Sequence, residues 1–262
     1  MTGRTEIDER FAAGTLDADV WVPAYLPAWS SRAEAAATWR VDEDGLTLSI
    51  PPEQGLWCAD RHDPPLRVSA VQSANWSGPV GSTRAQQPFR DGLTVREEQP
   101  PLWGFTPHHG RIEVECRATL TPAAMFSAWM VGLEDEPDRC GEICIVEVFG
   151  DALEHGPDGP TAALGAGIHA FRDPRLREEF AAPRTAIDVT QDHVYAVDWR
   201  PGAVDVLVDG TVVRTLRQAP AYPLMLILGV FDFPAHPRAG EAGGAVPELT
   251  VRRVTGWTAT DA

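Results

Sequence analysis

The stretch from Gly141 to Gly150, with the sequence GEICIVEVFG, constrains this chain more than any other. The run is apolar and β-branched between two terminal glycines, a pattern that predicts a buried strand rather than a helix. Two carboxylates, Glu142 and Glu147, lie inside it. Burying even an uncharged polar group without a partner costs roughly 2 to 7 kcal/mol, so two buried acids need a reason to be there. The floor of a cleft would supply one.

The directions of these two acids depend on whether the strand is regular. Side chains alternate with a period of two, so a regular strand would point Glu142 and Glu147 to opposite sides. A one-residue bulge between them would bring both onto one face, and bulges concentrate where a strand directs a side chain into a site. Two carboxylates about 5 to 5.5 Å apart across a groove are what a retaining glycosidase needs. The alternative is a strand with one acid on an exposed face and the other at a frayed end.

The rest of the chain predicts one all-β domain over residues 1–262. Its composition is 44% hydrophobic with 23 glycines and 23 prolines, which suits short strands and many turns. We expect residues 1–45 to form an N-terminal wrap with aromatic anchors, and Asp209–Gly210 to form a hairpin turn. Further strands are predicted at 46–52, 66–74, 79–84, 109–120, 125–132, 165–171, 192–200, 224–233 and 249–257. About a dozen short strands without a repeated helical pattern predict a sandwich of two sheets.

Charge and targeting signals exclude several function classes. A net charge of −16 argues against nucleic acid or an anionic membrane surface as a partner, because both require a basic patch. The chain as given shows no apolar stretch of signal-peptide or membrane-spanning length, so we expect a cytoplasmic location, or secretion if a signal has been trimmed. The four cysteines lack the spacing of a zinc site, and we expect free thiols. Nine tryptophans mildly favour a carbohydrate partner, because the indole face stacks on sugar rings.

Five segments resemble, in order, segments of the family 16 glycoside hydrolases, which include laminarinases, lichenases, agarases and carrageenases. The strand GEICIVE resembles the family's bulged signature E-x-D-x-x-E. The segments HGRIEVECRATL and MFSAWMVG resemble the strands that precede it, DHVYAVDWRPGAVDVLVDG a later hairpin, and LMLILGVFDF the penultimate strand. The likeness extends from about residue 68 to residue 256.

This resemblance implies a concanavalin A-like jelly-roll sandwich of two antiparallel sheets with a concave substrate groove. It also implies endo-acting, retaining cleavage of a β-linked polysaccharide of the β-glucan or galactan class. By position, Glu142 corresponds to the nucleophile and Glu147 to the general acid/base. The acid/base needs a raised pKa, which a neighbouring carboxylate supplies.

The resemblance also implies residues that bind the sugar. Trp129 corresponds to the aromatic side chain that stacks near the cleavage point, and Glu113 to a carboxylate that accepts hydrogen bonds from sugar hydroxyls. His169 falls where many relatives have a groove histidine, and Phe231 where they often have a tryptophan. We expect Trp103 to line the groove as well, because it lies in a loop near the matched strands.

One departure from the family pattern lies inside the signature. Cys144 stands where the family has an aspartate that hydrogen-bonds the nucleophile. A thiol is a weak donor, and beside carboxylates its pKa should rise, so it should be neutral at pH 7. We expect Cys144 to cap Glu142 and to lower the negative charge of the site, which would alter the chemistry without abolishing it.

Two further functions remain open at this stage. A carbohydrate-binding protein on the same scaffold would have lost turnover, although a lectin has no need of two apposed acids. A transglycosylase would differ only in whether sugar or water reaches the covalent intermediate. In every case the expected partner is a polysaccharide or oligosaccharide. No cofactor is expected for the chemistry, and no acidic loop shows the ligand spacing of the calcium site that relatives often carry.

Overall fold

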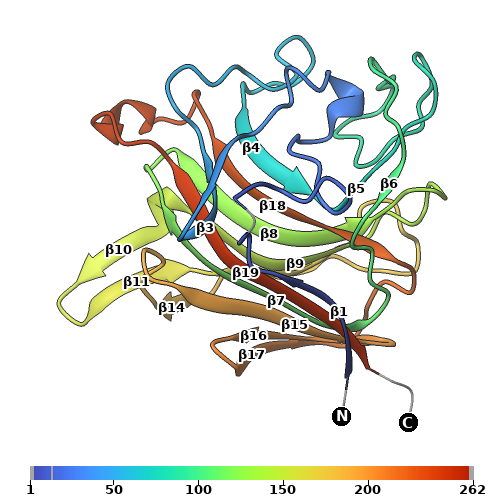
Figure 1. Ribbon diagram of the computed structural model, residues 1–262. Helices are drawn as coiled ribbons and strands as arrows, with labels where there is room; N and C mark the ends of the chain where they lie inside the picture. The colour runs from blue at the N-terminus through green and yellow to red at the C-terminus, as the bar shows by residue number, and fades with distance from the viewer. Residues whose placement is uncertain (1–2, 13, 260–262) are drawn as a thin grey trace.

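The computed structural model describes residues 3–12 and 14–259, and β-strands dominate this part of the chain (Figure 1). Two large antiparallel sheets are stacked on each other, which confirms the predicted jelly-roll sandwich. Three 3-10 turns interrupt the described strands, at Pro27–Trp29, Gly150–Ala152 and Ala239–Ala242. None of the helical segments in the described part is long and apolar enough to cross a membrane.

The first sheet has eight strands in the order β17-β16-β15-β7-β19-β3-β2, with β1 also paired to β19. Strand β19, near the end of the chain, therefore lies in the middle of this sheet between β7 and β3. The predicted hairpin turn at Asp209–Gly210 joins β16 to β17. The strands are β1 (Gly3–Glu9), β2 (Thr38–Asp42), β3 (Gly45–Ser49), β7 (Gly110–Thr119), β15 (His193–Arg200), β16 (Ala203–Val208), β17 (Thr211–Leu216) and β19 (Glu248–Ala259).

The second sheet has six strands in the order β13-β12-β9-β8-β18-β4. These are β4 (Arg67–Gln72), β8 (Ala124–Gly132), β9 (Glu142–Phe149), β12 (Gly165–His169), β13 (Glu179–Ala181) and β18 (Leu224–Asp232). The run that contains the two acids is thus a central strand, β9, between β8 and β12. Two small sheets complete the described strands. One pairs β5 (Ala74–Asn75) with β6 (Leu102–Trp103), and the other joins β10 (Leu153–Gly156), β11 (Gly159–Ala163) and β14 (Arg184–Ala186).

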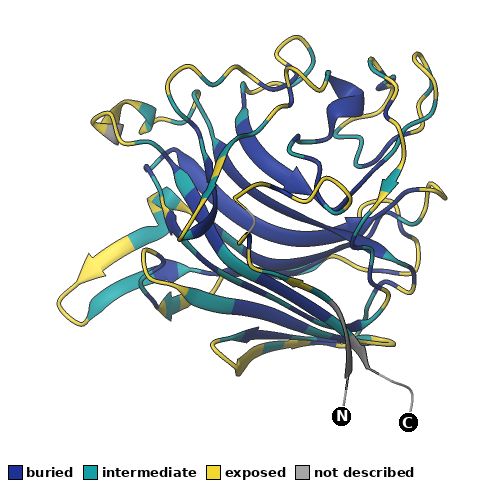
Figure 2. Cartoon of the chain, in the orientation of Figure 1, coloured by how far each residue is buried: buried dark blue, intermediate teal, exposed yellow. Residues whose placement is uncertain are grey.

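The main hydrophobic core fills the space between the two large sheets. Strand β7 alternates as the sequence predicts, with its apolar side chains in this core and its charged side chains on the outer face. The apolar set from β7 is Ile112, Val114, Cys116 and Ala118. It packs with alternate residues of β8 and β18, and Figure 2 shows the resulting dark layer of buried strands. The removal of this apolar surface from water is the main force that holds the two sheets together.

A second hydrophobic core covers part of the opposite face of the six-stranded sheet. Here Trp29 and Trp57 from the N-terminal third pack with Trp129 of β8 and Ile227 of β18. All nine residues of β8 are buried as a result, because both faces of the strand are covered. In Figure 1 the blue to green loops of the N-terminal third lie over this sheet. The predicted wrap over residues 1–45 therefore contributes a core layer and also supplies β1 and β2 to the other sheet.

One predicted strand is absent. Residues 79–84 form turns, and the nearest pairing is an isolated bridge between Ser77 and Ala85. Pro79 has no N–H to donate to a ladder, and Gly81 takes a positive φ of 86°, so neither residue suits a strand interior. This turn-rich loop leads instead to Gln86 and Gln87, which the structure places against the six-stranded sheet.

Gly132 at the end of β8 provides a test of the close packing beside β9. A Cβ atom at this position would lie 1.8 Å from the carbonyl oxygen of Arg139, so Gly132→Ala must displace the backbone that leads into β9. We expect this substitution to lower the free energy of unfolding by about 1–3 kcal/mol, measured by urea denaturation. Gly55→Ala is the control, because an added Cβ there meets no heavy atom within 4 Å, and it should change stability by less than about 0.5 kcal/mol. Equal losses in both variants would contradict the prediction.

Candidate active site

A cavity of about 420 Å³ opens on the face of the six-stranded sheet that is turned away from the eight-stranded sheet. Its floor consists of side chains from three adjacent strands of that sheet, namely Met125, Ser127, Trp129, Glu142, Glu147 and Phe231. Its walls come from loops of the N-terminal third and from the segment that follows β12, and they include Tyr25, Trp57, Gln87, Phe89, Phe171 and Arg172. The structure therefore places both predicted catalytic acids in one cavity with an aromatic lining.

A bulge in β9 is what brings the two acids onto one face. Ala128 pairs with Val146 and Trp129 pairs with Cys144, so a single step along β8 spans two residues of β9, with Ile145 as the extra one. The pairing of β9 with β12 shows the same irregularity. Ile145 joins the core between the sheets, while Glu142 and Glu147 line the cavity on the other side. The one-residue shift considered for this strand is thus present, and the alternative of two acids on opposite faces does not apply.

Glu142 is 8% exposed and accepts a hydrogen bond from the side-chain amide of Gln87, with 3.1 Å between Nε2 and Oε2. His169 lies opposite it on β12, with Nε2 4.0 Å from Oε1 of Glu142, and its Nδ1 is 2.6 Å from a carboxylate oxygen of Glu178. Burial is the main cause that raises the pKa of Glu142 to about 8, and the charge of Glu147 acts in the same direction. The hydrogen bond from Gln87 opposes this rise.

Glu147 lies opposite Ser127 of β8 and Gly165 of β12. Burial raises its pKa, and the charge of a protonated His169 would oppose the rise. The Ser127 hydroxyl is not available to this carboxylate as a donor in the structure, because it donates to the carbonyl oxygen of Val146. Glu142 and Glu147 are therefore both biased toward the protonated form by the same cause, which is removal from water.

The two carboxyls are coupled, because the charge of Glu147 contributes to the raised pKa of Glu142. A pKa of about 8 places a proton on Glu142 in the free protein at neutral pH, whereas a nucleophile has to be ionised. When the proton lies on Glu147 instead, Glu142 is ionised and the pair has the state from which a retaining glycosidase reacts. The structure thus provides two carboxyls in one cavity, both with raised pKa values, and the roles of the two members remain predictions from their positions in the sequence.

Cys144 lies on the same face as Glu142 but beneath the cavity, fully buried. Its pKa is raised by burial and by the two nearby carboxylates, so the thiol is neutral, as expected. The expected cap on Glu142 is not observed. The thiol points toward the carbonyl oxygen of Gly165 at 4.0 Å and makes no hydrogen bond to Glu142 among the described residues. A cysteine side chain is short and its thiol is a weak donor, and the donor that reaches Glu142 is the Gln87 amide. All four cysteines are free and buried, as predicted.

Three of the predicted sugar-binding residues lie in the cavity, namely Trp129, His169 and Phe231. Trp129 is 5% exposed, and its ring packs against Phe231 at 5.9 Å and against Tyr25 at 6.3 Å between centroids. Tyr25 also meets Phe231 edge-to-face at 5.4 Å. These three rings form one aromatic cluster beside the acids, and the stacking roles of Trp129 and Phe231 remain predictions.

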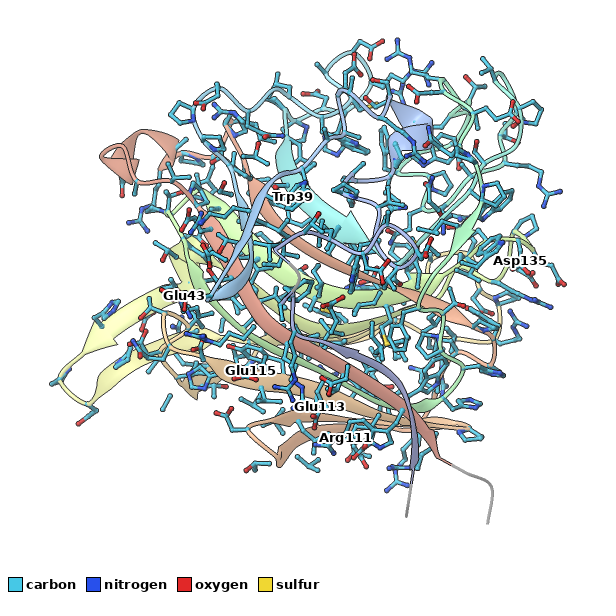
Figure 3. The ribbon with its side chains drawn as sticks, in the orientation of Figure 1. Trp39, Glu43, Arg111, Glu113, Glu115 and Asp135 are labelled. Carbon is cyan, nitrogen blue, oxygen red and sulfur yellow. The ribbon has the colours of Figure 1, made fainter. Side chains whose placement is uncertain are left out.

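Glu113 and Trp103 are not part of this cavity. Glu113 lies on β7 in the other sheet and points to its outer face, where it accepts hydrogen bonds from Arg111 at 2.8 Å and from Thr255 at 3.2 Å. Figure 3 shows Arg111, Glu113 and Glu115 together on this sheet. Trp103 is 48% exposed on β6. The prediction that Glu113 lines the groove was wrong because β7 belongs to the eight-stranded sheet, and alternation alone cannot show to which sheet a strand belongs. The prediction for Trp103 rested only on its position in a loop.

Sequence reasoning missed four residues of the cavity wall that matter to its chemistry: Gln87, Glu134, Arg172 and Tyr25. Glu134 is buried and paired with Arg172, and it also accepts the backbone N–H of Gln87 at 2.7 Å. Burial raises the pKa of Glu134, while Arg172 opposes the rise. These residues come from separate loops, and no local spacing in the sequence signals that they meet.

Within residues 3–12 and 14–259, no group of three or more His, Cys, Asp or Glu side chains could hold a metal ion. The groups in the cavity that can exchange protons with a bound sugar include the carboxyls of Glu142 and Glu147 and the imidazole of His169.

Comparison with known protein families shows to which family the chain belongs. The model of glycosyl hydrolases family 16 matches residues 104–240, which is more than half of the sequence. The chain therefore belongs to family 16 of the glycosyl hydrolases, a family of retaining glycoside hydrolases. No curated protein sequence matches it.

Solved structures share the fold at low sequence identity. One is a GlcNAcα1-4Gal-releasing endo-β-galactosidase from Clostridium perfringens, with 23% identity and a TM-score of 0.82 over 97% of this chain, which spans 62% of that structure's chain. Another is the catalytic domain of an endo-1,3-β-glucanase (laminarinase) from Thermotoga petrophila, with 15% identity, a TM-score of 0.62 and 99% coverage of both chains. A third comes from work on endo-acting O-glycanases that prominent members of the human gut microbiota use to initiate mucin breakdown, with 18% identity, a TM-score of 0.62 and coverage of 98% and 100%.

The raised pKa of Glu142 predicts how stability depends on pH. A group whose pKa is higher in the folded state stabilises the fold fully below its unfolded pKa of about 4.3, and that contribution is lost as pH rises toward 8. Glu142→Gln stays neutral and does not lose it. We therefore expect Glu142→Gln to gain stability over the wild type between pH 5 and 9, on the order of a few kcal/mol, in urea denaturation at each pH.

The matched control is Glu115→Gln, which removes one carboxylate from the outer face of the eight-stranded sheet (Figure 3). Its stability should follow that of the wild type across the same pH range. A constant difference between Glu142→Gln and the wild type from pH 5 to 9 would contradict the burial of this acid.

Proposed function

We propose that this chain is a retaining endo-glycosidase that cleaves a neutral β-linked glycan, with Glu142 as nucleophile and Glu147 as general acid/base. The observation that carries the proposal is the bulge at Ile145, which points a buried carboxyl, that of Glu142, and a half-buried one, that of Glu147, into one cavity. A binding protein has no use for such a pair, because two carboxyls withdrawn from water in one cavity cost stability and add little to sugar recognition.

In the proposed first step, ionised Glu142 attacks the anomeric carbon and forms a covalent glycosyl ester. The glycosidic bond breaks at the same time, and Glu147 gives its proton to the leaving oxygen. In the second step Glu147, now a carboxylate, takes a proton from water as the water oxygen attacks the same carbon, and the ester bond to Glu142 breaks. The singly protonated pair is regenerated, and the sugar keeps its anomeric configuration.

The charges of the cavity favour a neutral substrate. Glu134, Glu142 and Glu147 line it, and the one arginine among its described lining residues, Arg172, already pairs with Glu134. A sulfated or uronic acid polymer would bring further negative charge into this cavity, where no described lysine or unpaired arginine could neutralise it. The net charge of −16 on the whole chain acts in the same direction.

Within the neutral β-linked glycans, β-galactosides are the first substrates to test. The fold matches the Clostridium endo-β-galactosidase with a TM-score of 0.82, against 0.62 for the Thermotoga laminarinase. The predicted β-glucans remain in the same panel, because a shared fold alone does not determine the sugar.

A second function, carbohydrate binding without turnover, is favoured by one specific observation. Cys144 replaces the signature aspartate and gives Glu142 no hydrogen bond among the described residues. If this loss abolished attack by Glu142, the aromatic cavity would still bind a sugar. A transglycosylase would use the same pair and differ only in the acceptor that reaches the glycosyl ester.

The panel experiment separates these functions. We expect the wild type to release reducing ends from at least one neutral β-galactan or β-glucan, with the initial product keeping its anomeric configuration by NMR. Glu142→Gln and Glu147→Gln should each lose about 10²- to 10⁴-fold in kcat on that polymer. Glu115→Gln, which carries the same charge change outside the cavity, should keep wild-type activity.

The outcomes of this panel are distinct. Retardation of the protein in a polysaccharide gel without any cleavage would support the binding function instead. Longer glycans formed from added acceptor sugars would identify a transglycosylase. Cleavage that survives both glutamine substitutions would overturn the assignment of the pair.

The pH dependence of kcat/KM provides a further prediction. The rate should fall at low pH as the pair takes up its second proton, and at high pH, near 8, as it loses the last one. With an activated aryl glycoside that needs no protonated leaving group, Glu147→Gln should move the acidic limb to lower pH, because the charge that raises the pKa of Glu142 is gone. An unshifted limb in this variant would contradict the coupling of the two acids.

A further inference from the structure

Gln87 is the side chain that holds Glu142 in this structure. Its Nε2 donates to Oε2 of Glu142 at 3.1 Å, whereas the thiol of Cys144 lies toward Gly165. The contact joins residues 55 positions apart, from a loop that precedes the part of the chain matched by the family model. Among the described residues, no other side chain donates a hydrogen bond to Glu142.

The backbone around Gln87 is fixed in a way that aims this amide. Gln87 has a φ of 43°, a left-handed conformation that is unfavourable for a residue with a Cβ, and Pro88 follows it. Its N–H donates to Oε1 of Glu134 at 2.7 Å, and Glu134 is itself buried and paired with Arg172. Non-glycine residues persist in such conformations where their surroundings determine them, often at functional sites. Arg172, Glu134 and Gln87 thus form a chain of contacts that ends on Glu142.

The orientation of the amide fits an ionised Glu142. An amide nitrogen can only donate, and an ionised carboxylate is a stronger acceptor than a neutral carboxyl, so this pairing favours the charged form of the acid. The amide oxygen of Gln87 is buried and has no hydrogen-bond partner among the described residues, so it is the nitrogen end that sets the direction of the side chain. A donor on one carboxylate oxygen favours the ionised form over the protonated form.

We propose that Gln87 is the positioning residue that orients Glu142 and favours its ionised form for attack, in place of the signature aspartate that Cys144 replaces. This inference rests on the proposed function and deepens it. It explains how a chain without the aspartate can still present an ionised nucleophile from a buried pair. The residue that orients Glu142 would thus come from a loop that covers the sheet, and not from β9 itself.

The test compares Gln87→Met with Gln86→Met. Methionine has a similar length to glutamine and cannot donate. Gln86 is the adjacent residue of the same loop, and it contacts Met225 and the backbone of Trp76 rather than Glu142. We expect Gln87→Met to raise the pKa of Glu142 by about one unit, so that kcat at pH 6 falls about tenfold while KM changes little. Gln86→Met should keep the wild-type pH profile.

A negative charge added at this position gives a second, larger effect to measure. Gln87→Glu retains the length but adds a charge beside Glu142, so its acidic limb should move further to high pH than that of Gln87→Met. A wild-type profile in Gln87→Met, or the same shift in Gln86→Met, would overturn the proposal, since the effect would then come from the loop and not from the donor.

A measurement that needs no substrate separates this proposal from the proposed function. The side-chain carboxyl of Glu142 can be titrated by ¹³C NMR in the wild type and in Gln87→Met, with its signal assigned by its loss in Glu142→Gln. A raised pKa in Gln87→Met supports the role of Gln87 even if no polymer is cleaved, in which case the proposed function alone fails. An unchanged pKa overturns the role of Gln87 even in an active enzyme.

Discussion

The bulge at Ile145 is the constraint on which the site depends. If the same sequence paired as a regular strand, without the bulge, the period of two would send Glu147 into the core between the sheets, where an unpaired carboxylate is far more costly than an apolar side chain. With it, Ile145 fills the core and both acids face the cavity. The one-residue bulge therefore keeps apolar side chains in the core on one side of β9 and places both acids in the cavity on the other side.

Burial by the N-terminal third both raises the pKa of Glu142 and brings the side chain that opposes this rise. The N-terminal third covers the six-stranded sheet so closely that Glu142 is nearly inaccessible, which raises its pKa far above that of a free glutamate. The same coverage supplies Gln87, the donor that opposes the rise. The loops that exclude water from Glu142 thus also supply Gln87, whose hydrogen bond lowers the pKa of Glu142 again. The same part of the chain therefore determines both effects on this carboxyl.

The sequence predicted the elements that depend on local pattern. The sandwich, the central strand, its two acids, the free thiols and the hairpin at Asp209–Gly210 all follow from alternation, β-branching and turn chemistry, and the structure shows them. It could not assign Glu113, because an alternating strand has the same pattern in either sheet, and only pairing with β15 and β19 places it outside. Gln87 was beyond reach because its partner is 55 residues away and its loop carries no periodic signal.

The central place of β19 has a consequence for how this protein is made. Because β19 lies between β7 and β3 and also pairs with β1, the eight-stranded sheet stays open until β19 itself has left the ribosome. Strand β4 likewise waits for β18, about 150 residues later, before the second sheet closes. The nascent chain therefore carries its N-terminal tryptophans without their final packing while the intervening strands are made. Completion of the eight-stranded sheet waits for β19, and loss of this strand would leave β7, β3 and β1 each with an unpaired edge in the middle of the sheet.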